Sequence, residues 1–314
     1  MPKVAISIII PVSNNLEYFN ECICSVLRQT LKNIEIIVID DCSSDANYLN
    51  IISQFQDRRF KFIRNDKQIG SGMSRNKGMA CAEGEYIAFL DADDFYPNST
   101  SLEVLYNTAL SNELNICGGS LFIVDGQSKV VNKKFPGQYF NKPGIVFYAD
   151  YQHDGGFYRF IYKRTFLLDN NLSFPDFKRM QDPVFFVKSM LAAGCFFAVN
   201  MYVYAYRKNH KQLIWDHIKI VDHYAAIKQI LKLSKKNKLA HLHYLMVKNF
   251  YHFSTINLGN VKGIFKRFRI VYSTIKLIDF ELLNKKWPND TESFGVVKIF
   301  SVLLLSFFGS KENL

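Results

Sequence analysis

The amino-acid sequence predicts an α/β fold, with a mostly parallel sheet flanked by helices and followed by a helical C-terminal region. Two observations predict this fold. Short apolar runs alternate with helix-period segments over the first hundred residues, and apolar residues recur at helical spacing from Ile214 almost to the end. Strands and helices in alternation are typical of parallel sheets with right-handed crossovers. We therefore expect two domains, one over residues 1–212 and a basic helical one over residues 213–314.

Four apolar runs are the predicted parallel strands. The first is nearly continuous and rich in β-branched residues, which is typical of a strand buried on both faces. The four runs are residues 4–12, 34–41, 61–64 and 86–90. Helices are predicted between them, over 16–27, from the second run to about residue 56, and over 72–82.

The pattern loosens after Thr100, which forms a predicted capping box with Glu103 at the start of a helix that ends near Asn112. Residues 117–150 mix short apolar runs with Gly and Pro, and we expect strands and loops of the same domain there. The last elements predicted in this domain are a helix over 185–193 and a strand over 195–206.

The composition limits the class of protein. Of 314 residues, 48% are apolar and 21% are charged, which excludes a disordered, collagen-like or low-complexity chain. The six cysteines include no C-x-x-C pair, which indicates reduced thiols in a cytosolic protein, not a disulfide framework or a zinc site. The N-terminus runs directly into a predicted strand with no cleavable signal before it, so we expect a cytoplasmic protein.

The net charge of +11 belongs to the last third of the chain. Residues 1–199 hold 20 Lys and Arg against 21 Asp and Glu, whereas residues 200–314 hold 19 against 7. A neutral part followed by a basic part suggests two tasks, the second of which faces an anionic partner.

Two segments of the basic part carry long apolar stretches. Residues 261–282 place apolar side chains on one helical stripe with Lys and Arg over much of the remainder, and residues 294–308 are apolar nearly all round. As a helix, the second segment measures roughly 22 Å, which is short of the ~30 Å hydrocarbon core of a bilayer. One expectation is an interfacial helix beside a basic patch at a membrane surface. The other is that both segments pack on the N-terminal domain or on a second subunit of a homodimer.

Polar residues collect at the carboxyl ends of the four predicted strands, which parallel strands place along one edge of the sheet. The clusters are Pro11 to Asn15, Asp40-Asp41, Gly70 to Asn76 and Asp91 to Asp94. A D-x-D triplet with an arginine nearby suits a nucleoside diphosphate, because hard divalent cations bind carboxylate and phosphate oxygens together. Single Asp residues after strands are often turn formers. Two acidic clusters at neighbouring strand ends repel each other, however, which favours a functional role with a cation.

The chain resembles the family 2 glycosyltransferases with the GT-A fold, a Rossmann-like α/β fold. Five blocks carry the resemblance in the family's order and spacing: S-I-I-I-P-V-S-N-N, S-V-L-R-Q-T, E-I-I-V-I-D-D-C-S-S-D, G-S-G-M-S-R-N-K-G and A-E-G-E-Y-I-A-F-L-D-A-D-D. The resemblance implies an inverting enzyme of bacterial surface-glycan synthesis. It implies a nucleotide-sugar donor, UDP-hexose or UDP-N-acetylhexosamine, and a glycan or lipid-linked glycan acceptor from capsule or lipooligosaccharide assembly.

The resemblance also implies a donor site built from residues of these blocks. Its members are Pro11, Val12, Asn14, Asp41, Arg75, Asp91 and Ala92. In this site Asp41 bonds the base, Asp91 meets the ribose, and Asp93 binds Mg²⁺ or Mn²⁺. Two positions depart from the family pattern, because Cys42 stands where Gly or Asn is common and Ser13 where an aromatic is common.

The catalytic base implied by the resemblance is Asp182, in the segment R-M-Q-D-P-V-F-F, where Gln181 replaces the family's Glu. One carboxylate suffices to take the proton of the acceptor hydroxyl, because the metal stabilises the leaving diphosphate. A plain N-cap before Pro183 is the structural alternative. Candidate acceptor or diphosphate contacts are Asp154, Arg159, Arg164 and Gln181, and His210 is a candidate metal ligand. The alternatives are solvated basic side chains and an ordinary loop histidine.

Three other protein classes fit the sequence less well than a glycosyltransferase does. A dinucleotide-binding oxidoreductase is excluded because Gly70-Ser71-Gly72 lacks the third glycine of the fingerprint, Arg75 standing in its place. A sugar nucleotidyltransferase is closer, but its glycine-rich loop after the first strand is absent. A basic nucleic-acid-binding protein is the non-enzymatic alternative, suggested by the net charge and the 15% aromatic content. We expect no nucleic acid as a partner, because the basic residues lie on segments whose apolar faces suit a membrane or a core.

Overall fold

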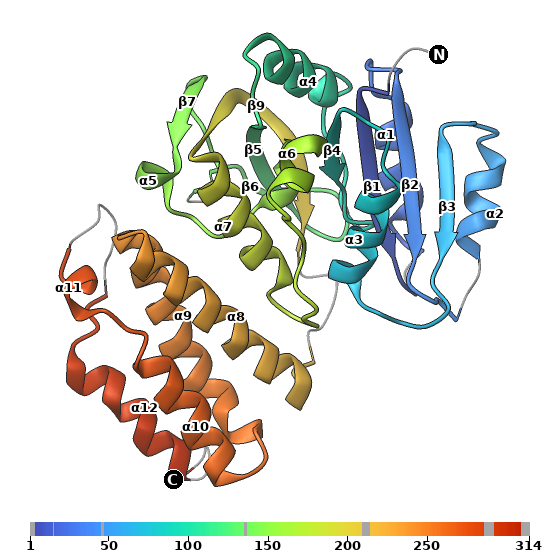
Figure 1. Ribbon diagram of the computed structural model, residues 1–314. Coiled ribbons are helices and arrows are strands. Elements are labelled where there is room, and N and C mark those ends of the chain that lie inside the picture. Colours follow the sequence, from blue (N-terminus) through green and yellow to red (C-terminus); the bar gives the residue numbers. More distant parts are fainter. Residues whose placement is uncertain are drawn as a thin grey trace. The chain divides into compact units, whose positions relative to one another are not determined.

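A mixed sheet of nine strands organises the N-terminal part of the chain in the computed structural model (Figure 1). The structure describes residues 4–14, 16–44, 47–134, 137–208, 214–285 and 292–308, and the nine strands are counted within these ranges. The strand order is β3-β2-β1-β4-β8-β5-β9-β7, with β6 paired to β5. The strands are β1 (Ile6–Val12), β2 (Ile34–Asp40), β3 (Phe60–Arg64), β4 (Tyr86–Phe89), β5 (Ile116–Val124), β6 (Val130–Asn132), β7 (Gly144–Phe147), β8 (Phe160–Lys163) and β9 (Cys195–Arg207).

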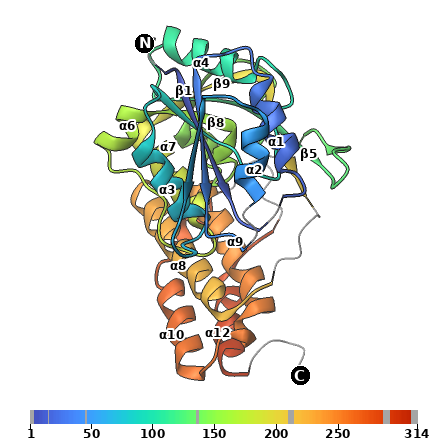
Figure 2. The same cartoon turned by 90° about the vertical axis from the view of Figure 1, so that its right-hand side faces the viewer.

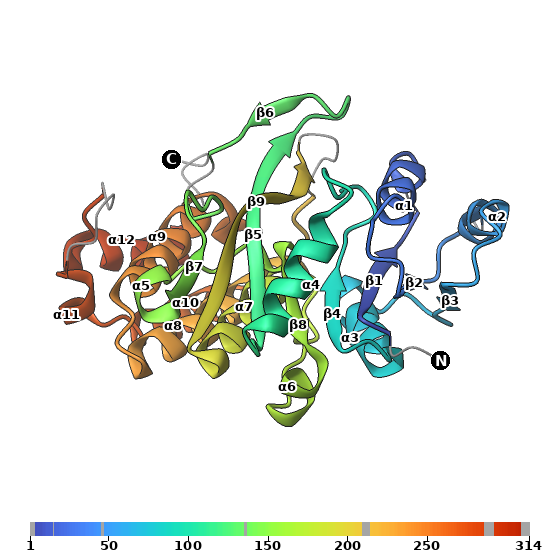
Figure 3. The same cartoon turned by 90° about the horizontal axis from the view of Figure 1, so that it is seen from above.

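The first four strands are parallel, as predicted, and the predicted α/β fold is confirmed. The antiparallel pairs come from the later strands: β8 pairs with β4 and β5, and β7 pairs with β9. Strand β6 pairs with the end of β5 and lies off the main path of the sheet (Figure 3). The helices that accompany the sheet are α1 (Phe19–Leu27), α2 (Asn47–Gln54), α3 (Ser71–Cys81), α4 (Ser101–Ser111), α5 (Tyr148–Tyr151), η1 (Phe157–Arg159), α6 (Arg164–Asp169) and α7 (Gln181–Ala193).

The chain divides into two compact units. The first comprises residues 1–151, 155–176 and 188–212, and the second comprises residues 152–154, 177–187 and 213–314. Two short segments, 152–154 and 177–187, therefore group with the second unit although they precede residue 213.

Helices form the C-terminal part of the second unit, coloured orange to red in Figure 1. Helix α8 packs on α9, and α12 packs on α9 and α10. The helices are α8 (His217–Lys236), α9 (Ala240–Asn257), η2 (Leu258–Asn260), α10 (Ile264–Ile275), α11 (Phe280–Leu283) and α12 (Val296–Phe308). None of the helices in the described ranges is long and apolar enough to cross a membrane.

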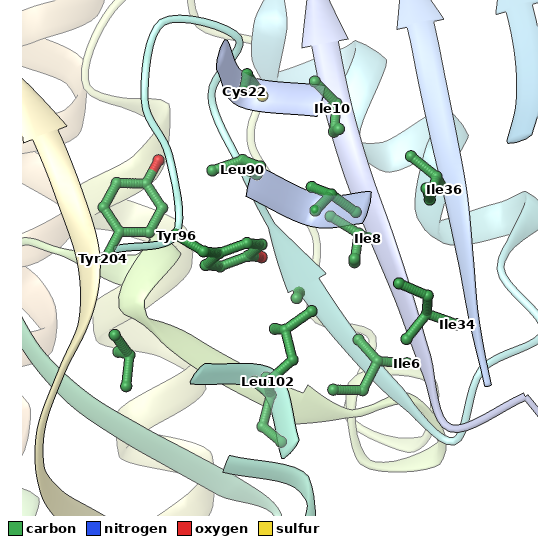
Figure 4. Close-up of a cluster of buried hydrophobic side chains, with 14 of the residues drawn as sticks. Ile6, Ile8, Ile10, Cys22, Ile34, Ile36, Leu90, Tyr96, Leu102 and Tyr204 are labelled. Carbon is green, nitrogen blue, oxygen red and sulfur yellow. The ribbon is translucent and has the colours of Figure 1, made fainter. Parts of the chain in front are cut away.

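The buried strands are covered by helices on both faces of the sheet. Ile6, Ile8 and Ile10 of β1 alternate toward one face, where they join side chains of α1, α2 and α4 in a buried apolar cluster (Figure 4). Ile9 points to the other face, where α3 lies; Figure 2 shows α3 on one side of the strands and α1 and α2 on the other. Helix α3 approaches closely because Gly78 has no side chain: a Cβ there would lie 2.5 Å from Ile9 Cγ2. This approach fixes the N-terminus of α3 beside the strand ends.

Two local predictions differ from the structure. The capping box is wrong, because Thr100 makes no side-chain cap and the Glu103 carboxylate instead accepts a hydrogen bond of 2.8 Å from the Thr30 hydroxyl. The single helical stripe predicted over 261–282 is divided into α10 and α11, because the chain turns after α10 and restarts with Asp279 as the N-cap of α11.

Candidate active site

The carboxyl ends of β1, β2 and β4 lie side by side. Ile6 of β1 pairs in parallel register with Ile34 of β2 and with Tyr86 of β4, so the polar residues that follow these strands meet at one edge of the sheet. The predicted donor-site residues that follow or end the strands are thus brought together: Pro11, Val12, Asn14, Asp41, Asp91, Ala92 and Asp93.

The Asp41 carboxylate anchors the turn between β3 and α3. Its oxygens accept hydrogen bonds from the backbone amides of Ile69 and Gly70, each at 2.8 Å, and from the Asn65 side-chain amide at 3.0 Å. The side chain is 4% exposed. Since an ionised carboxylate has about four lone-pair sites, three are used to hold the turn. The contact to a base predicted for Asp41 stays a prediction.

A second network joins the β1 turn to the β2 turn. Asn14 donates its backbone amide to the Ser43 hydroxyl at 3.0 Å, and its side-chain oxygen accepts from the amide and hydroxyl of Ser44. Buried Asp40 holds Ser43 and pairs with Arg64 at 2.7 Å. Cys42 between them has a φ of +57°, in the left-handed region. Gly and Asn adopt this region most readily, which gives a physical reason for their frequency at this position in the family that the sequence resembles.

Arg75 of α3 and Asp91 after β4 form an ion pair of 2.5 Å. The guanidinium is buried between two rings, 4.9 Å from the centroid of Phe157 and 5.3 Å from that of Phe174. The side chain of Asp91 is 25% exposed, so the carboxylate, not the guanidinium, is presented at the surface. The buried guanidinium of Arg75 therefore orients the partly exposed carboxylate of Asp91.

The acidic turn, residues 91–94, is held in place by β9. The Tyr204 hydroxyl accepts from the Asp91 amide at 3.2 Å and donates to the Asp94 carboxylate at 2.7 Å. Arg207 donates its backbone amide to Asp94 and its Nε to the carbonyl of Asp93. Burial raises the pKa of the Asp94 carboxyl well above its ordinary value, and the charges of Asp93 and Asp91 raise it further.

The acidic turn fits a divalent cation that is shared with a bound phosphate. The carboxylates of Asp91 and Asp93 are partly exposed, and their oxygens are the hard donors that Mg²⁺ and Mn²⁺ prefer. In the part of the chain that the structure describes, no three His, Cys, Asp or Glu side chains are grouped as a metal site. A cation here would therefore take one or two carboxylates, with phosphate oxygens and water as its other ligands.

Asp182 lies in the first turn of α7 and is partly exposed, in the second unit. The helix begins at Gln181, so Asp182 stands in its first turn, where the N-terminal end of the helix dipole favours a negative charge. Asp154 of the same unit is near enough for the two charges to interact. Burial, with a smaller contribution from the charge of Asp182, raises the pKa of Asp154 to about 6.

Residues 7–198, more than half of the chain, match the family model described as Glycosyl transferase family 2. The chain belongs to this family.

Relatives from bacteria and a solved structure accompany the family match. The chain is 31% identical over 215 residues to the putative glycosyltransferase EpsH of Bacillus subtilis, covering 66% of this chain and 62% of EpsH. It is 35% identical over 130 residues to the UDP-Glc:α-D-GlcNAc-diphosphoundecaprenol β-1,3-glucosyltransferase WfgD of Escherichia coli, covering 41% of this chain and 51% of WfgD. The crystal structure of Staphylococcus aureus TarS 1–349 with UDP-GlcNAc has a TM-score of 0.69 at 19% identity, covering 88% of this chain and 82% of that one. TarS shows that the GT-A fold is shared.

Arg159 is a structural residue in this family 2 chain, and the predicted ligand contact is wrong. Its side chain is 1% exposed and lies between the rings of Phe140 and Phe160, with its carbon 4.6 Å from each centroid. The guanidinium donates to the carbonyls of Gly119 and Gly137 and to the Tyr151 hydroxyl. These bonds tie β5 to the segments around it and leave no surface for a substrate.

Arg164, the second arginine predicted to contact the acceptor or the diphosphate, lies at the other edge of the sheet. Strand β8 runs antiparallel to β4, so the residue after β8 meets the start of β4: Arg164 donates its Nε to the Gly84 carbonyl at 2.9 Å. Asp91 lies beyond the other end of β4, roughly 20 Å from Glu85 at about 3.3 Å per residue. Arg164 lines a cavity of about 300 Å³ together with residues of α3 and of the segment 167–173. His210, the candidate metal ligand, lies outside the described residues.

Two residues of β9 hold the acidic turn of this family 2 chain, and the sequence analysis did not identify them. Tyr204 and Arg207 are 0% and 2% exposed, and both serve the acidic turn. Arg207 is held in turn by Glu21 of α1, at 2.5 Å, and by the hydroxyl of Ser128. The sequence feature that indicates them is Arg207, a charged residue at the end of a strand whose other residues are mostly apolar.

We expect Tyr204→Phe to destabilise the first unit by about 2 kcal/mol, because it leaves the buried Asp94 carboxylate without one of its donors. The matched control is Tyr202→Phe on the same strand, whose hydroxyl bonds the Lys133 carbonyl at a more exposed position; it should cost less than about 0.5 kcal/mol. Urea unfolding of both variants measures the difference. Equal losses would show that Tyr204 does not support the acidic turn.

Asp154→Asn should change how stability depends on pH. A native pKa of about 6 lies above the unfolded value near 3.8, so the wild type loses stability as the unfolded chain ionises first between about pH 4 and pH 6. The variant lacks this loss. Its free energy of unfolding should therefore rise relative to that of the wild type between about pH 4 and pH 6, and the difference should stay constant at higher pH. Urea unfolding at pH 4.5 and pH 7 measures the gain. Asp150→Asn, at an exposed carboxylate of α5, is the control and should show no gain.

Proposed function

We propose that this family 2 chain transfers a sugar from a UDP-linked donor to a hydroxyl of a glycan or lipid-linked glycan, with inversion at the anomeric carbon. One observation carries the proposal: the acidic turn, fixed from β9 and paired with Arg75, stands at the carboxyl ends of parallel strands. In open α/β sheets this edge is where ligands bind.

Relatives support the classes of donor and acceptor. WfgD is named for UDP-Glc as donor and for a diphosphoundecaprenol-linked acceptor, and TarS was solved with UDP-GlcNAc. Both names fit a UDP-hexose or UDP-N-acetylhexosamine donor. They also fit the synthesis of a surface polysaccharide or lipooligosaccharide, with an acceptor that is met at the cytoplasmic face of the inner membrane.

The donor half of the reaction uses the first unit. Pro11, Val12 and Asn14 line the nucleotide pocket at the end of β1, and the turn that Asp41 holds closes it. Asp91, oriented by Arg75, accepts hydrogen bonds from the ribose. Asp93 would hold Mn²⁺ or Mg²⁺ together with the donor diphosphate. When bound, the cation supplies positive charge that stabilises the diphosphate as it leaves.

The acceptor half uses the Asp182 carboxylate. Asp182 accepts the proton of the acceptor hydroxyl while that oxygen forms a bond to the anomeric carbon. The bond from the anomeric carbon to the donor diphosphate breaks in the same step, and UDP leaves with the electron pair. Asp154, whose pKa of about 6 leaves it ionised at neutral pH, contacts a sugar hydroxyl beside Asp182.

A thermal shift separates this function from its rivals. UDP with Mn²⁺ should raise the melting temperature of the protein by several degrees, whereas Mn²⁺ alone should not. A sugar nucleotidyltransferase would instead be stabilised by a nucleoside triphosphate, and a nucleic-acid-binding protein would show salt-dependent retention on oligonucleotides. A panel of UDP-sugars then identifies the donor by the release of UDP.

Asp93→Ala should weaken UDP binding in the presence of Mn²⁺ at least about tenfold, because it removes the carboxylate proposed to share the cation. Calorimetric titration with UDP, with and without Mn²⁺, measures the change, and transfer should be lost with it. Asp169→Ala removes an exposed carboxylate of α6 and is the control. If Asp93→Ala keeps its Mn²⁺-dependent affinity, the cation does not bind at this residue.

Asp182→Asn should lower turnover by about 10³-fold and leave the affinity for UDP unchanged, since a base acts on the acceptor and not on the donor. Transfer to the acceptor and UDP binding are measured on the same sample. The control is Asp176→Asn, which makes the same exchange at an exposed carboxylate six residues earlier. Near-normal turnover of Asp182→Asn would remove this residue from the mechanism.

A further inference from the structure

Helices α10 and α12 of the second unit leave a large apolar surface exposed. The exposed fractions are 87% for Phe265, 86% for Val297 and 62% for Leu304. The two helices form one surface, because the ring of Phe268 on α10 lies 5.5 Å from that of Phe307 on α12. We call this surface the α10–α12 face, made of Phe265, Phe268, Val297, Phe300, Leu304 and Phe307.

The exposed side chains of the α10–α12 face are separate from the residues that form the core of the unit. On α12, Val297, Phe300, Leu304 and Phe307 recur at helical spacing on one side, while Ile299 and Val302 on the other side are fully buried. On α10 the same division separates the exposed Phe265 stripe from buried residues such as Val271. The helices are thus already packed, and a contiguous apolar surface of this kind marks an interaction site.

Basic residues border the α10–α12 face. Residues 262–278 contain five Lys and Arg and no Asp or Glu. Arg269 of α10 and Lys276, the C-cap residue after this helix, are exposed and stand four and eleven residues after Phe265, on the same helical stripe. The ammonium of Lys276 lies 4.5 Å from the ring centroid of Tyr272, at the end of this stripe. The surface therefore combines exposed rings with positive charge.

We propose that the α10–α12 face docks on the surface of a bilayer that contains anionic lipids. Aromatic and aliphatic side chains that enter the headgroup region, flanked by Lys and Arg that meet lipid phosphates, are the two features that interfacial helices combine. With 13 residues, α12 measures about 20 Å and lies in the interface without crossing the membrane. The inference rests on the proposed function in one respect: an acceptor carried on a lipid would be met at this surface.

Charge argues against the other occupants. A second copy of the chain would bring the same basic residues to the same face, so an isologous contact would place like charges together. A polyanion in water would meet the Lys and Arg but would leave Phe265, Val297 and Leu304 exposed. An anionic bilayer satisfies both the charges and the rings.

Vesicle flotation tests the proposal with the full-length protein. The probe is a vesicle of 70% phosphatidylcholine and 30% phosphatidylglycerol, compared with pure phosphatidylcholine. We expect at least tenfold more protein on the anionic vesicles at low salt, and a decrease at 0.5 M NaCl. Phe265→Ser with Leu304→Ser should lower binding at least tenfold, and so should Arg269→Glu with Lys276→Glu.

Matched controls make the same exchanges away from the face. Ile256→Ser changes an exposed residue of α9, and Lys142→Glu an exposed lysine of the first unit; neither should affect flotation. Point variants are used because deleting α12 would uncover Ile299 and Val302. Circular dichroism and melting of each variant report folding.

Several outcomes would overturn the proposal. One is equal flotation of wild type and both double variants, and another is no binding of the wild type to anionic vesicles. A dimer in light scattering that Phe265→Ser with Leu304→Ser dissociates would assign the face to a second copy instead. Salt-sensitive retention on a polyanion without flotation would assign it to a soluble acceptor. UDP binding with Mn²⁺, measured on the same samples, separates failure of this inference from failure of the proposed function.

Discussion

The two hydrogen bonds that the Asp94 carboxylate accepts, from the Tyr204 hydroxyl and the Arg207 amide, are the constraint on which the candidate active site depends. They fasten the acidic turn to a strand that lies more than a hundred residues later in the chain. Three carboxylates close together repel each other, and burial disfavours the charge of Asp94 further. Without β9 the turn would open, and Asp91 would no longer face Arg75. The chemistry proposed for this edge therefore requires the complete sheet.

The positions of the strand ends could be predicted from the sequence because they follow from periodicity and from the parallel register. The strands that end at Asp40 and before Asp91 both pair in parallel with β1, so their carboxyl ends reach the same edge of the sheet. The sequence motifs then identified the family. They also assigned Arg75 and Asp91, which form an ion pair, to the same predicted site. These inferences needed only local patterns.

The remainder depended on long-range packing, which local patterns do not contain. Arg159 resembles a surface arginine in the sequence, but the rings and carbonyls that enclose it come from β5, β8 and the segment before β7. Arg164 was misassigned because the antiparallel direction of β8 reverses which edge its end reaches. Tyr204 and Arg207 were missed because their partners lie far away in the chain.

The position of Arg75 between Phe157 and Phe174 has a consequence for how this enzyme can diversify. Both rings also pack on Phe89 of β4, so one aromatic cluster supports the strand, the helix and the segment after Gly155. A change in this segment would shift the rings and, through Arg75, the Asp91 carboxylate at the ends of the parallel strands. The segment and this edge of the sheet therefore diversify together, and a chimera that exchanges residues 155–176 alone would also displace Asp91.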